Sequence, residues 1–334
     1  MKPLVSILIP AYQVELYLDR CLQSVRQQTY ENVEVIILDD GSTDKTKDIA
    51  MQYATTFSNR FFYLRDKHRG VSNARQRLIS LARGEYVFFL DADDYLDKYI
   101  IEILVDVATH YSADIVQSDV YLTESSEIAS IEYNNAQIHS YTSDQAVDAL
   151  QCGNDRLRCM MWAKLYKSSL FREIIFPIGK IHEDEAVMHR LMGKSNKIVN
   201  ISLPLYYYFR NPFGIMNKEF SYDRYDILDA IDDRISFCNS KGLMFSAQMC
   251  CLRYCIECMA LYQQTANNIN ESDENLEFLH RKFNSKVNSA LKIIYLDDDV
   301  RQILREWGRL PQNIMIPNYW SISERYFKKY RSER

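Results

Sequence analysis

The first 120 residues alternate between short, mostly apolar runs and stretches in which apolar residues recur every three or four positions. The apolar runs have the length and composition of strands buried on both faces, and they lie at residues 4–9, 33–38, 61–64 and 86–90. The periodic stretches predict amphipathic helices, and they lie at residues 14–28, 43–53, 71–82 and 96–108. Ser42 or Thr43 is expected to cap the second of these helices. The alternation predicts an α/β fold with a mostly parallel sheet flanked by helices.

The pattern changes after residue 120. Shorter strands and loops are expected to about residue 166, and from about residue 222 to the end the apolar spacing is almost wholly helical. Three longer elements are also predicted, a strand at 114–120, a helix at 183–193 and a strand at 198–210. We therefore expect two domains, residues 1–215 and an all-helical region over 216–334, divided where Pro and Gly interrupt the chain at 211–214.

Composition is that of an ordinary globular protein. The chain has 334 residues, of which 47% are hydrophobic and 25% charged, enough for two packed domains. The net charge of −5 argues against a nucleic-acid partner, which usually requires a basic face. The apolar run 4–9 is too short for a signal peptide, and no apolar stretch approaches the length of a membrane span. These features predict a cytoplasmic protein.

Four of the eight cysteines cluster in one predicted helix, at Cys250, Cys251, Cys255 and Cys258. A Cys-x-x-Cys pair can bind zinc, but no second pair stands at a partnering distance. Helical spacing places most of the cluster on one face. We therefore expect reduced thiols buried in a core.

The fourth apolar run ends at three carboxylates, Asp91, Asp93 and Asp94. Carboxylates at the end of a buried strand are costly unless they bind something. Asp91 and Asp93 can offer oxygens to a divalent cation, and such cations accompany diphosphates. The alternative is that Asp93 or Asp94 caps the helix predicted at 96–108, although capping does not need all three carboxylates.

Two other strands also end in polar sequence. Pro10-Ala11-Tyr12 follows the first strand, and Asp39-Asp40-Gly41-Ser42 follows the second. A basic loop at 67–70 then leads through Gly70 into a helix, a place suited to a diphosphate. Because the carboxyl ends of parallel strands meet at one edge of a sheet, these segments should converge there.

Seven motifs along the chain together are far more specific than any one of them. They are SILIPAY from Ser6, SVRQQTY from Ser24, VIILDDGSTD from Val35, GVSNAR from Gly70, GEYVFFLDADD from Gly84, WAKLY from Trp162 and HEDE from His182. In this order they resemble the family 2 glycosyltransferases, inverting enzymes with the GT-A fold. The likeness covers roughly the first 210 residues.

The resemblance implies roles for residues at the sheet edge. It implies that Asp39 accepts a hydrogen bond from the base, which favours uracil, and that Asp93 binds Mn²⁺ or Mg²⁺ bridging the diphosphate. The other residues that it places along the donor nucleotide are Pro10, Ala11, Tyr12, Gly70, Ala74, Arg75, Asp91 and Ala92. Two positions depart from the family pattern, since His68 and Gln76 stand where Asn is common.

The family's reaction also needs a base. Displacing a nucleoside diphosphate builds negative charge on the leaving phosphate, and the attacking sugar hydroxyl must lose its proton. Glu183 and Asp184 are the candidate bases; the alternative is that they only stabilise a helix N-terminus. We favour Asp184, because its short side chain loses less freedom when fixed and Glu183 shares a stripe with Val187 and Leu191.

Three residues are candidates for contact with the acceptor or the sugar. Trp162 and the aromatic run 206–209 could stack on sugar rings, or they could pack in the core. Lys164 lies in the WAKLY motif, and Arg210 could reach a phosphate or lie on the surface. The chain lacks the Gln-x-x-Arg-Trp motif of processive synthases in this family, which favours a single addition per encounter.

The predicted activity is metal-assisted transfer of a sugar from a UDP-sugar to a saccharide acceptor, in capsular or other surface polysaccharide synthesis. The acceptor can be carried on a membrane lipid, and an assembly of several copies is compatible with the sequence. One alternative is a catalytically silent partner subunit. Another is a sugar nucleotidylyltransferase, which the absence of a glycine-rich loop after the first strand argues against.

The last predicted helix, residues 319–334, has an aromatic side and a basic side. Its aromatic residues alternate with basic ones, among them Trp320 and Arg325. Such a helix suits an anionic membrane surface, which predicts peripheral contact with the inner face of the membrane. The alternative is that its aromatic side packs against the helical domain.

Overall fold

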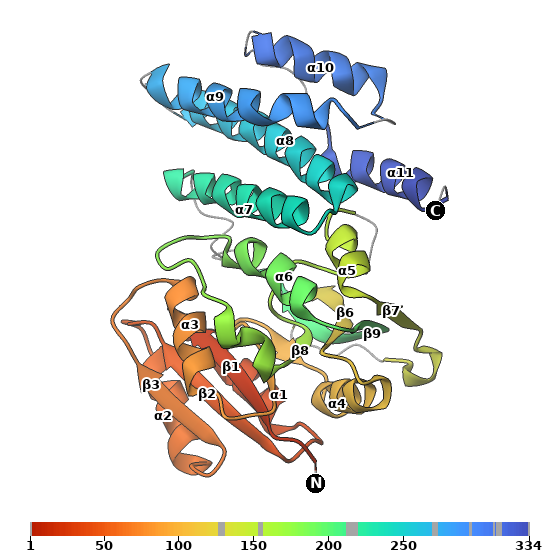
Figure 1. Ribbon diagram of the computed structural model, residues 1–334. Coiled ribbons are helices and arrows are strands. Elements are labelled where there is room, and N and C mark those ends of the chain that lie inside the picture. The colour runs from red at the N-terminus through yellow and green to blue at the C-terminus, as the bar shows by residue number, and fades with distance from the viewer. Residues whose placement is uncertain are drawn as a thin grey trace. The chain divides into compact units, whose positions relative to one another are not determined.

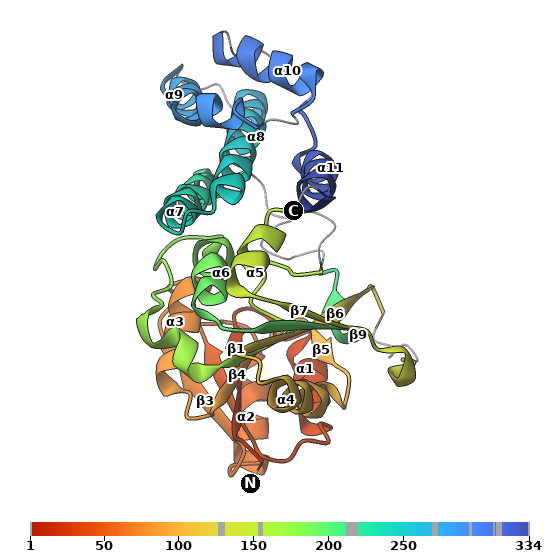
Figure 2. The same ribbon diagram turned by 45° about the vertical axis from the view of Figure 1, so that its right-hand side comes forward.

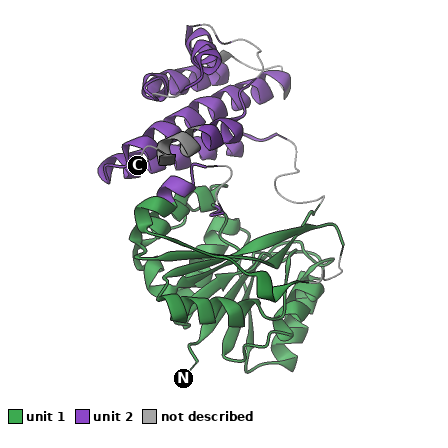
Figure 3. Ribbon diagram, turned by 90° about the vertical axis from the view of Figure 1, so that its right-hand side faces the viewer, with its two compact units in different colours: residues 1–146, 159–218 green, residues 147–158, 219–334 purple. Residues whose placement is uncertain are grey.

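The computed structural model divides the chain into two compact units (Figure 3). The first contains residues 1–146 and 159–218, and the second contains residues 147–158 and 219–334. The residues described are 2–125, 131–152, 156–211, 220–268, 273–293, 296–309, 311 and 316–332. For residues 268, 273 and 326–332 only the backbone is described. The predicted boundary at 211–214 therefore lies almost wholly outside the described residues.

A single sheet forms the centre of the first unit (Figures 1 and 2). Within the described residues its strands are β1 (Val5–Ala11), β2 (Val33–Asp39), β3 (Phe61–Arg65), β4 (Tyr86–Phe89), β5 (Tyr95–Leu96), β6 (Ile115–Thr123), β7 (Ile138–Tyr141), β8 (Lys164–Lys167) and β9 (Ile198–Phe209). Their order is β3-β2-β1-β4-β8-β6-β9-β5, with β7 also beside β9.

The predicted fold class is confirmed, with one refinement. Strands β3, β2, β1 and β4 are parallel, as the strand–helix alternation predicted. Beyond β4 the sheet is mixed, because β8 runs antiparallel to both β4 and β6 while β9 runs parallel to β6.

Helices cover both faces of the sheet. In the first unit they are α1 (Leu18–Arg26), α2 (Thr46–Thr56), α3 (Val71–Leu81), α4 (Ile100–Tyr111) and α6 (Glu183–Lys194), with short 3₁₀ turns at η1 (Tyr133–Asn135) and η2 (Ser168–Glu173). The apolar sides of α1 and α4 share one core with alternate residues of the central strands, such as Ile7 and Phe88. The neighbouring strand residue Phe89 faces α3, where the Arg75 guanidinium lies 5.9 Å from its ring centre.

The expected cap of α2 is wrong. Ser42 Oγ accepts the backbone N–H of Gln13 at 3.0 Å, and Thr43 Oγ1 accepts the side-chain amide of Gln13 at 3.0 Å. The helix begins later, at Thr46, whose backbone N–H donates to the Asp44 carboxylate at 3.1 Å. The sequence offers three adjacent capping residues, and the loop after β1 occupies the first two.

The second unit is helical in its described residues. Its elements are η4 (Tyr222–Tyr225), α7 (Asp226–Ser240), α8 (Met244–Asn268), α9 (Asp273–Ala290), α10 (Asp298–Arg309) and α11 (Tyr319–Ser332), preceded by the end of α5 (Ser143–Ala149). Residues 147–158, which the sequence pattern assigned to the first domain, belong to this unit. The reason is packing, since the Gln151 carbonyl accepts the Tyr319 hydroxyl at 3.0 Å and its side-chain oxygen accepts the Cys250 thiol at 3.1 Å.

The four clustered cysteines are buried in the core of this unit, as predicted. Burial raises the pKa of the Cys250 and Cys255 thiols well above the usual value, so these thiols stay protonated.

None of the helices in the described part of the chain is long and apolar enough to span a bilayer. In α11 the Trp320 ring lies 5.1 Å beneath the Arg253 guanidinium, and Arg325 pairs with Asp297 at 2.8 Å. The side chains from Tyr326 onward lie outside the described residues. Contact between this helix and a membrane therefore stays a prediction.

Candidate active site

Strand register brings the predicted donor residues to one edge of the sheet. Ala11 pairs with Asp39, and Asp39 pairs with Arg65, so the ends of β1, β2 and β3 lie in one row. The Leu90 N–H donates to the Leu8 carbonyl at 3.0 Å, which extends the row toward Asp91. This edge carries the carboxyl ends of four parallel strands, the usual place for a ligand in such sheets.

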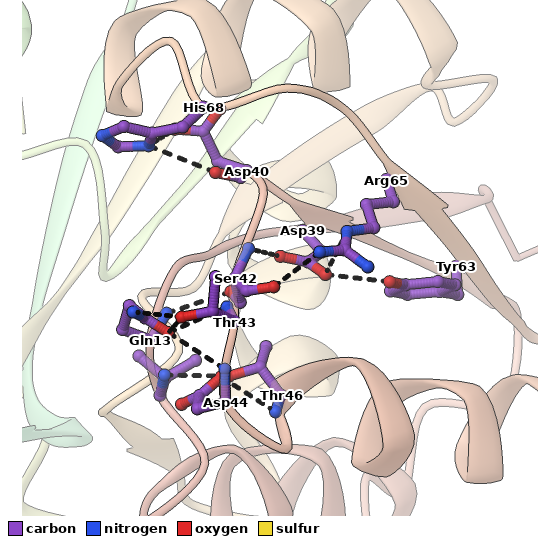
Figure 4. A network of polar contacts seen from close by, with 11 residues as sticks. Gln13, Asp39, Asp40, Ser42, Thr43, Asp44, Thr46, Tyr63, Arg65 and His68 are labelled. Carbon is purple, nitrogen blue, oxygen red and sulfur yellow. Dashed lines mark hydrogen bonds and ion pairs between the residues drawn. The ribbon is translucent and has the colours of Figure 1, made fainter.

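Asp39 is fully buried and held from several sides (Figure 4). Its carboxylate accepts the Ser42 N–H at 2.7 Å and the Tyr63 hydroxyl at 2.9 Å, and Arg65 Nε lies 3.5 Å away. Burial and then the hydrogen bond to Asp39 raise the pKa of Tyr63, so its hydroxyl remains a donor. The side chain is thus fixed before any ligand arrives.

Asp40 holds the basic loop that opens α3, a role that the sequence did not reveal. Its two carboxylate oxygens accept the N–H groups of Arg69 and Gly70 at 2.9 and 2.8 Å, and His68 Nδ1 lies 2.8 Å away (Figure 4). The His68 ring in turn stacks on Tyr12, with ring centres 4.0 Å apart. In the sequence Asp39 and Asp40 are adjacent aspartates in one turn. Only the tertiary structure distinguishes them, because the loop 68–70 lies against Asp40.

Gly41 is required by this approach. Its φ is +81°, and a Cβ on it would lie 2.8 Å from the backbone nitrogen of His68. We expect Gly41→Ala to displace the loop and to weaken nucleotide binding, because the obstruction is backbone and cannot rotate away. The matched control is Gly242→Ala, which has a similar φ of +71° and no atom within 4 Å. Calorimetry with UDP and thermal melting check both variants; equal nucleotide affinity in the two would contradict the assignment.

The expectation that Asp93 or Asp94 caps the following helix is wrong. The short strand β5 intervenes and α4 begins only at Ile100, three residues after Asp97, whose carboxylate accepts the Tyr99 N–H at 2.9 Å. Asp94 instead ties the turn to the end of β9, since it accepts the Tyr206 hydroxyl at 2.6 Å and the Phe209 N–H at 2.8 Å. Burial, and then the charges of Asp93 and Asp91, raise its pKa well above the usual value.

Asp93 is held in place by two residues that the sequence did not indicate. Asn211 donates its side-chain amide to the Asp93 carboxylate at 3.0 Å. Arg20 donates to the Asp93 carbonyl at 2.7 Å, and its guanidinium lies 4.3 Å from the Phe209 ring centre. Burial and then the charge of Asp91 raise the pKa of the Asp93 carboxyl, so a cation between the two carboxylates would relieve their repulsion.

The carboxylates of Asp91 and Asp93 fit a divalent cation that takes its other ligands from water and from a bound phosphate. Among the residues that the structure describes, no three His, Cys, Asp or Glu side chains are grouped so that they could hold a metal ion by themselves. Hard cations are often bound through one or two carboxylates together with substrate phosphates. Asp93, with Asp91 beside it, would therefore hold a cation only in company with a diphosphate.

Arg75 joins Asp91, at the sheet edge where the predicted donor residues lie, to helix α6. Its guanidinium Nη2 lies 2.8 Å from Asp91 Oδ1, and Nη1 pairs with Glu183 Oε1. The side chains of Arg75 and Glu183 are only 5% and 8% exposed, whereas Asp91 is 29% exposed. Because a buried carboxylate needs a cation, Glu183 serves to fix the start of α6 against α3.

Asp184, the next residue, has a different environment. Burial raises its pKa, neighbouring Glu185 raises it further, and Arg75 acts in the opposite direction. The backbone N–H of Glu185 donates to Asp184 Oδ1 at 2.7 Å. A carboxylate with a raised pKa is a stronger base than an ordinary aspartate, which is compatible with a general base, and the catalytic role of Asp184 stays a prediction.

Unfavourable backbone conformations gather around these segments. Among described residues other than glycine, four have positive φ, and three of them flank site motifs: Gln13 after β1, Ala163 beside Trp162, and His182 before α6. The fourth, Ser112, merely ends α4. Conformations of this kind cost of order 1–3 kcal/mol each and persist where the surroundings impose them, often at functional sites.

Of the three residues predicted to touch the sugar or acceptor, Trp162 and Lys164 are buried and Arg210 is exposed. Trp162 is 8% exposed and stacks on Tyr206 and Tyr208, with ring centres 4.9 and 5.2 Å away. Lys164 is buried and donates to the Met160 carbonyl at 2.5 Å, and Arg210 pairs with Glu124 at 3.3 Å with both side chains exposed. These places match the packing and surface alternatives, and contact with a sugar stays a prediction.

The remaining donor candidates surround the same edge. Ala11, Ala74 and Ala92 are buried, Pro10 is half-buried, and Tyr12 is 41% exposed. Gly70 precedes α3 with φ +86°, and a Cβ there would meet no atom within 4 Å. The structure thus leaves Tyr12 as the most accessible of these side chains.

Comparison with known proteins points to one family. A model of the family described as glycosyl transferase family 2 matches residues 6–175. Glycosyltransferase GlyG of Streptococcus pneumoniae is 33% identical over 258 residues, which span 73% of this chain and 83% of GlyG. Glycosyltransferase GlyA of the same organism is 27% identical over 82% of this chain, but the match spans only 40% of GlyA.

Among solved structures, S. aureus TarS 1–349 in complex with UDP-GlcNAc is similar over the whole chain. The TM-score is 0.69 at 16% sequence identity, and the match covers 93% of the TarS chain. At this identity the likeness shows a common fold.

Proposed function

This chain belongs to glycosyl transferase family 2 and is a glycosyltransferase, and on that basis we propose that it moves a sugar from a UDP-sugar to a hydroxyl of a saccharide acceptor with inversion. The observation that carries the proposal is the Arg75 bridge, since one buried guanidinium contacts both Asp91 and Glu183. It joins the edge where a nucleotide would lie to the helix that presents Asp184. A donor site and a base are thereby held in one rigid frame.

Uridine is the proposed base of the donor. Asp39 lies at the end of β2, next in register to Ala11, and Tyr12 is 41% exposed although one face of its ring stacks on His68. A TarS structure of the same fold holds UDP-GlcNAc, which supports a UDP-sugar as the donor class. Bases stack well on exposed aromatic faces, and a fixed carboxylate accepts the imide N–H of uracil.

In the proposed reaction the acceptor hydroxyl oxygen attacks the anomeric carbon of the donor sugar. The bond from that carbon to the diphosphate oxygen breaks, and its electron pair leaves with UDP. The acceptor proton passes to the Asp184 carboxylate, so charge and atoms balance. Attack opposite the leaving group inverts the anomeric carbon.

Asp93 and Asp91 would hold the divalent cation, Mn²⁺ or Mg²⁺, which offsets the charge that grows on the leaving diphosphate. Arg75 is a poor substitute for that cation, because both of its terminal nitrogens already face carboxylates. The other groups of this chain that would face the diphosphate are the N–H groups in the first turn of α3. The N–H groups of Arg69 and Gly70, just before that turn, donate to Asp40, which holds the loop in place.

A panel of nucleotide sugars tests the proposed activity. The purified chain is incubated with each donor and Mn²⁺, and release of the nucleoside diphosphate is measured with and without candidate saccharide acceptors. UDP-sugars should be the donors that release diphosphate, and an acceptor should increase the rate. If no donor releases its nucleoside diphosphate, the chain would be a catalytically silent partner subunit. The presence of Asp39, Asp91, Asp93 and Asp184 argues against that outcome.

Nucleotide affinity should depend on the cation. We expect UDP to bind only weakly in the presence of a chelator, because the diphosphate then lacks its counter-charge beside Asp91 and Asp93. Asp93→Ala should bind UDP equally weakly with or without Mn²⁺. The control is Asp106→Ala, which removes an exposed carboxylate of α4. Calorimetry measures the UDP affinity of the parent and of Asp93→Ala, each with and without Mn²⁺. The same affinity in these four measurements would reject the cation site.

The acceptor is proposed to be a saccharide of a bacterial surface polysaccharide, either free or carried on a membrane lipid. This part rests on the motif resemblance. Peripheral contact of α11 with the inner face of the membrane would bring the enzyme to a lipid-linked acceptor.

A further inference from the structure

Helix α3 contacts the segment that precedes α6 at two places and the first residue of α6 at a third. Ser72 Oγ donates to the Lys180 carbonyl at 2.7 Å, and Gln76 Oε1 accepts the Phe176 N–H at 2.9 Å. The third contact is the ion pair of Arg75 with Glu183. Figures 1 and 2 both show this segment running beside α3 before it enters α6.

The segment 174–182 contains no helix or strand, and Gly179 and His182 have φ of +76° and +60°. Ile174 and Phe176 anchor its first residues, since both are buried and the Phe176 ring centre lies 6.2 Å from that of Phe89. None of residues 177–182 is buried, and Ile178 is 61% exposed. In this second part, where apolar burial is small, hydrogen bonds contribute to holding the segment, and loss of one of them favours local opening.

The same helix begins at the donor edge. Its first residues follow Gly70, whose N–H is held by Asp40, and Ser72 and Gln76 lie within the next two turns. Residues spaced by four on a helix share one face, which is why Ser72 and Gln76 reach the same segment. One helix, α3, therefore follows the loop 67–70 at its start and contacts, along its side, the segment that leads into the helix of Asp184.

We propose that Ser72 and Gln76 are positioning residues for the transfer reaction. They hold the segment 174–182 on α3 and so set the position of Asp184 relative to the donor. This inference rests on the proposed function, in which Asp184 is the base. A misplacement of about 1 Å in a catalytic group can lower the rate by about a hundredfold, so loss of one tether can be felt at the reaction centre.

The test uses paired substitutions in the full chain. Gln76→Met keeps the length of the side chain and removes the strong acceptor, whereas Gln76→Glu keeps an acceptor for the Phe176 N–H. Ser72→Ala removes the donor to Lys180. The matched control is Ser80→Ala, because Ser80 Oγ donates only to the Arg77 carbonyl of the same helix and contacts no loop residue in the described contacts.

We expect Gln76→Met and Ser72→Ala to lower transfer and hydrolysis of the donor by about tenfold, because water and the acceptor hydroxyl lose their proton to the same base. The UDP affinity should stay near that of the parent, and Gln76→Glu should restore transfer. Hydrogen exchange of the segment 174–183 should become faster in Gln76→Met and Ser72→Ala, and unchanged in Ser80→Ala. A purely structural role would instead lower transfer, hydrolysis and UDP affinity together.

Two outcomes separate this inference from the proposed function. If Asp184→Asn abolishes transfer while Gln76→Met and Ser72→Ala leave transfer, hydrolysis and exchange unchanged, the tether inference is overturned and the function stands. If Asp184→Asn transfers normally, the proposed function fails, and the exchange data alone show whether the tethers hold the segment. Failure of Gln76→Glu to restore transfer would also overturn the role given to Gln76.

Discussion

Replacing Asp184 with Asn is expected to lower the transfer rate by about a hundredfold or more while UDP affinity stays nearly intact. The asparagine keeps the shape of the side chain and cannot accept the acceptor proton. Burial raises the pKa of Asp184, and Glu185 raises it further. The parent's rate should therefore fall as the pH drops through this raised pKa, because protonation removes the base. The measurement is the transfer rate across pH, beside UDP affinity.

The matched variant is Glu183→Gln, one residue earlier. Glu183 is paired with Arg75 and buried, so its loss should act through stability and leave more of the transfer rate than Asp184→Asn does. The pH profile of Asp184→Asn should lack the acid limb that the parent shows. Near-normal transfer in Asp184→Asn together with an inactive but folded Glu183→Gln would mean that Glu183 is the base.

The second large effect is expected from Arg75→Leu. This change leaves the carboxylates of Glu183 and Asp91 without their shared cation, and removing one partner from a buried ion pair costs about 3–5 kcal/mol. We therefore expect a lower free energy of unfolding for the first unit, faster hydrogen exchange in α3 and α6, and loss of transfer. Urea titration followed by circular dichroism measures the first of these.

A double variant separates the ion pair from general damage to the core. Arg75→Leu combined with Glu183→Leu leaves only Asp91 unpaired, and that side chain is 29% exposed and can be hydrated. Most of the lost stability should return in the double variant, because the two effects share one interaction and do not add. Transfer should remain low in both, since α6 is no longer tied to α3. If the double variant loses as much stability as the two single variants together, the broken Arg75–Glu183 ion pair is not the cause of the loss.

Raised carboxylate pKa values gather at the turn after β4. Burial is the first cause for both Asp93 and Asp94, and their neighbours' negative charges add to it. The two residues nevertheless differ in their partners, because both Asp94 oxygens accept hydrogen bonds, from the Tyr206 hydroxyl and the Phe209 N–H. Asp93 accepts a neutral amide from Asn211, a weaker hydrogen bond that the proposed cation would replace.

The sequence was sufficient for the parallel half of the fold. Each of the first four strands is mostly apolar, because strands covered by helices on both faces need apolar side chains at nearly every position. Two buried exceptions, Ser6 and Glu34, hydrogen-bond to each other at 2.6 Å. The polar residues that follow Ala11, Asp39 and Leu90 could be placed at one edge by topology alone, and the register agrees. The helical C-terminal region and its buried thiols also followed from periodicity.

Contacts between distant segments were decided only by the tertiary structure. Local pattern could not distinguish Asp39 from Asp40, or Asp93 from Asp94, because adjacent aspartates have the same composition and differ only in which loop or strand approaches them. The same holds for Arg20 and Asn211, which reach Asp93 from 73 and 118 residues away, and for Gln76, which reaches Phe176 across 100 residues. Hydrophobic periodicity reports which face of an element is buried, whereas hydrogen-bond and charge partners depend on how the elements are brought together.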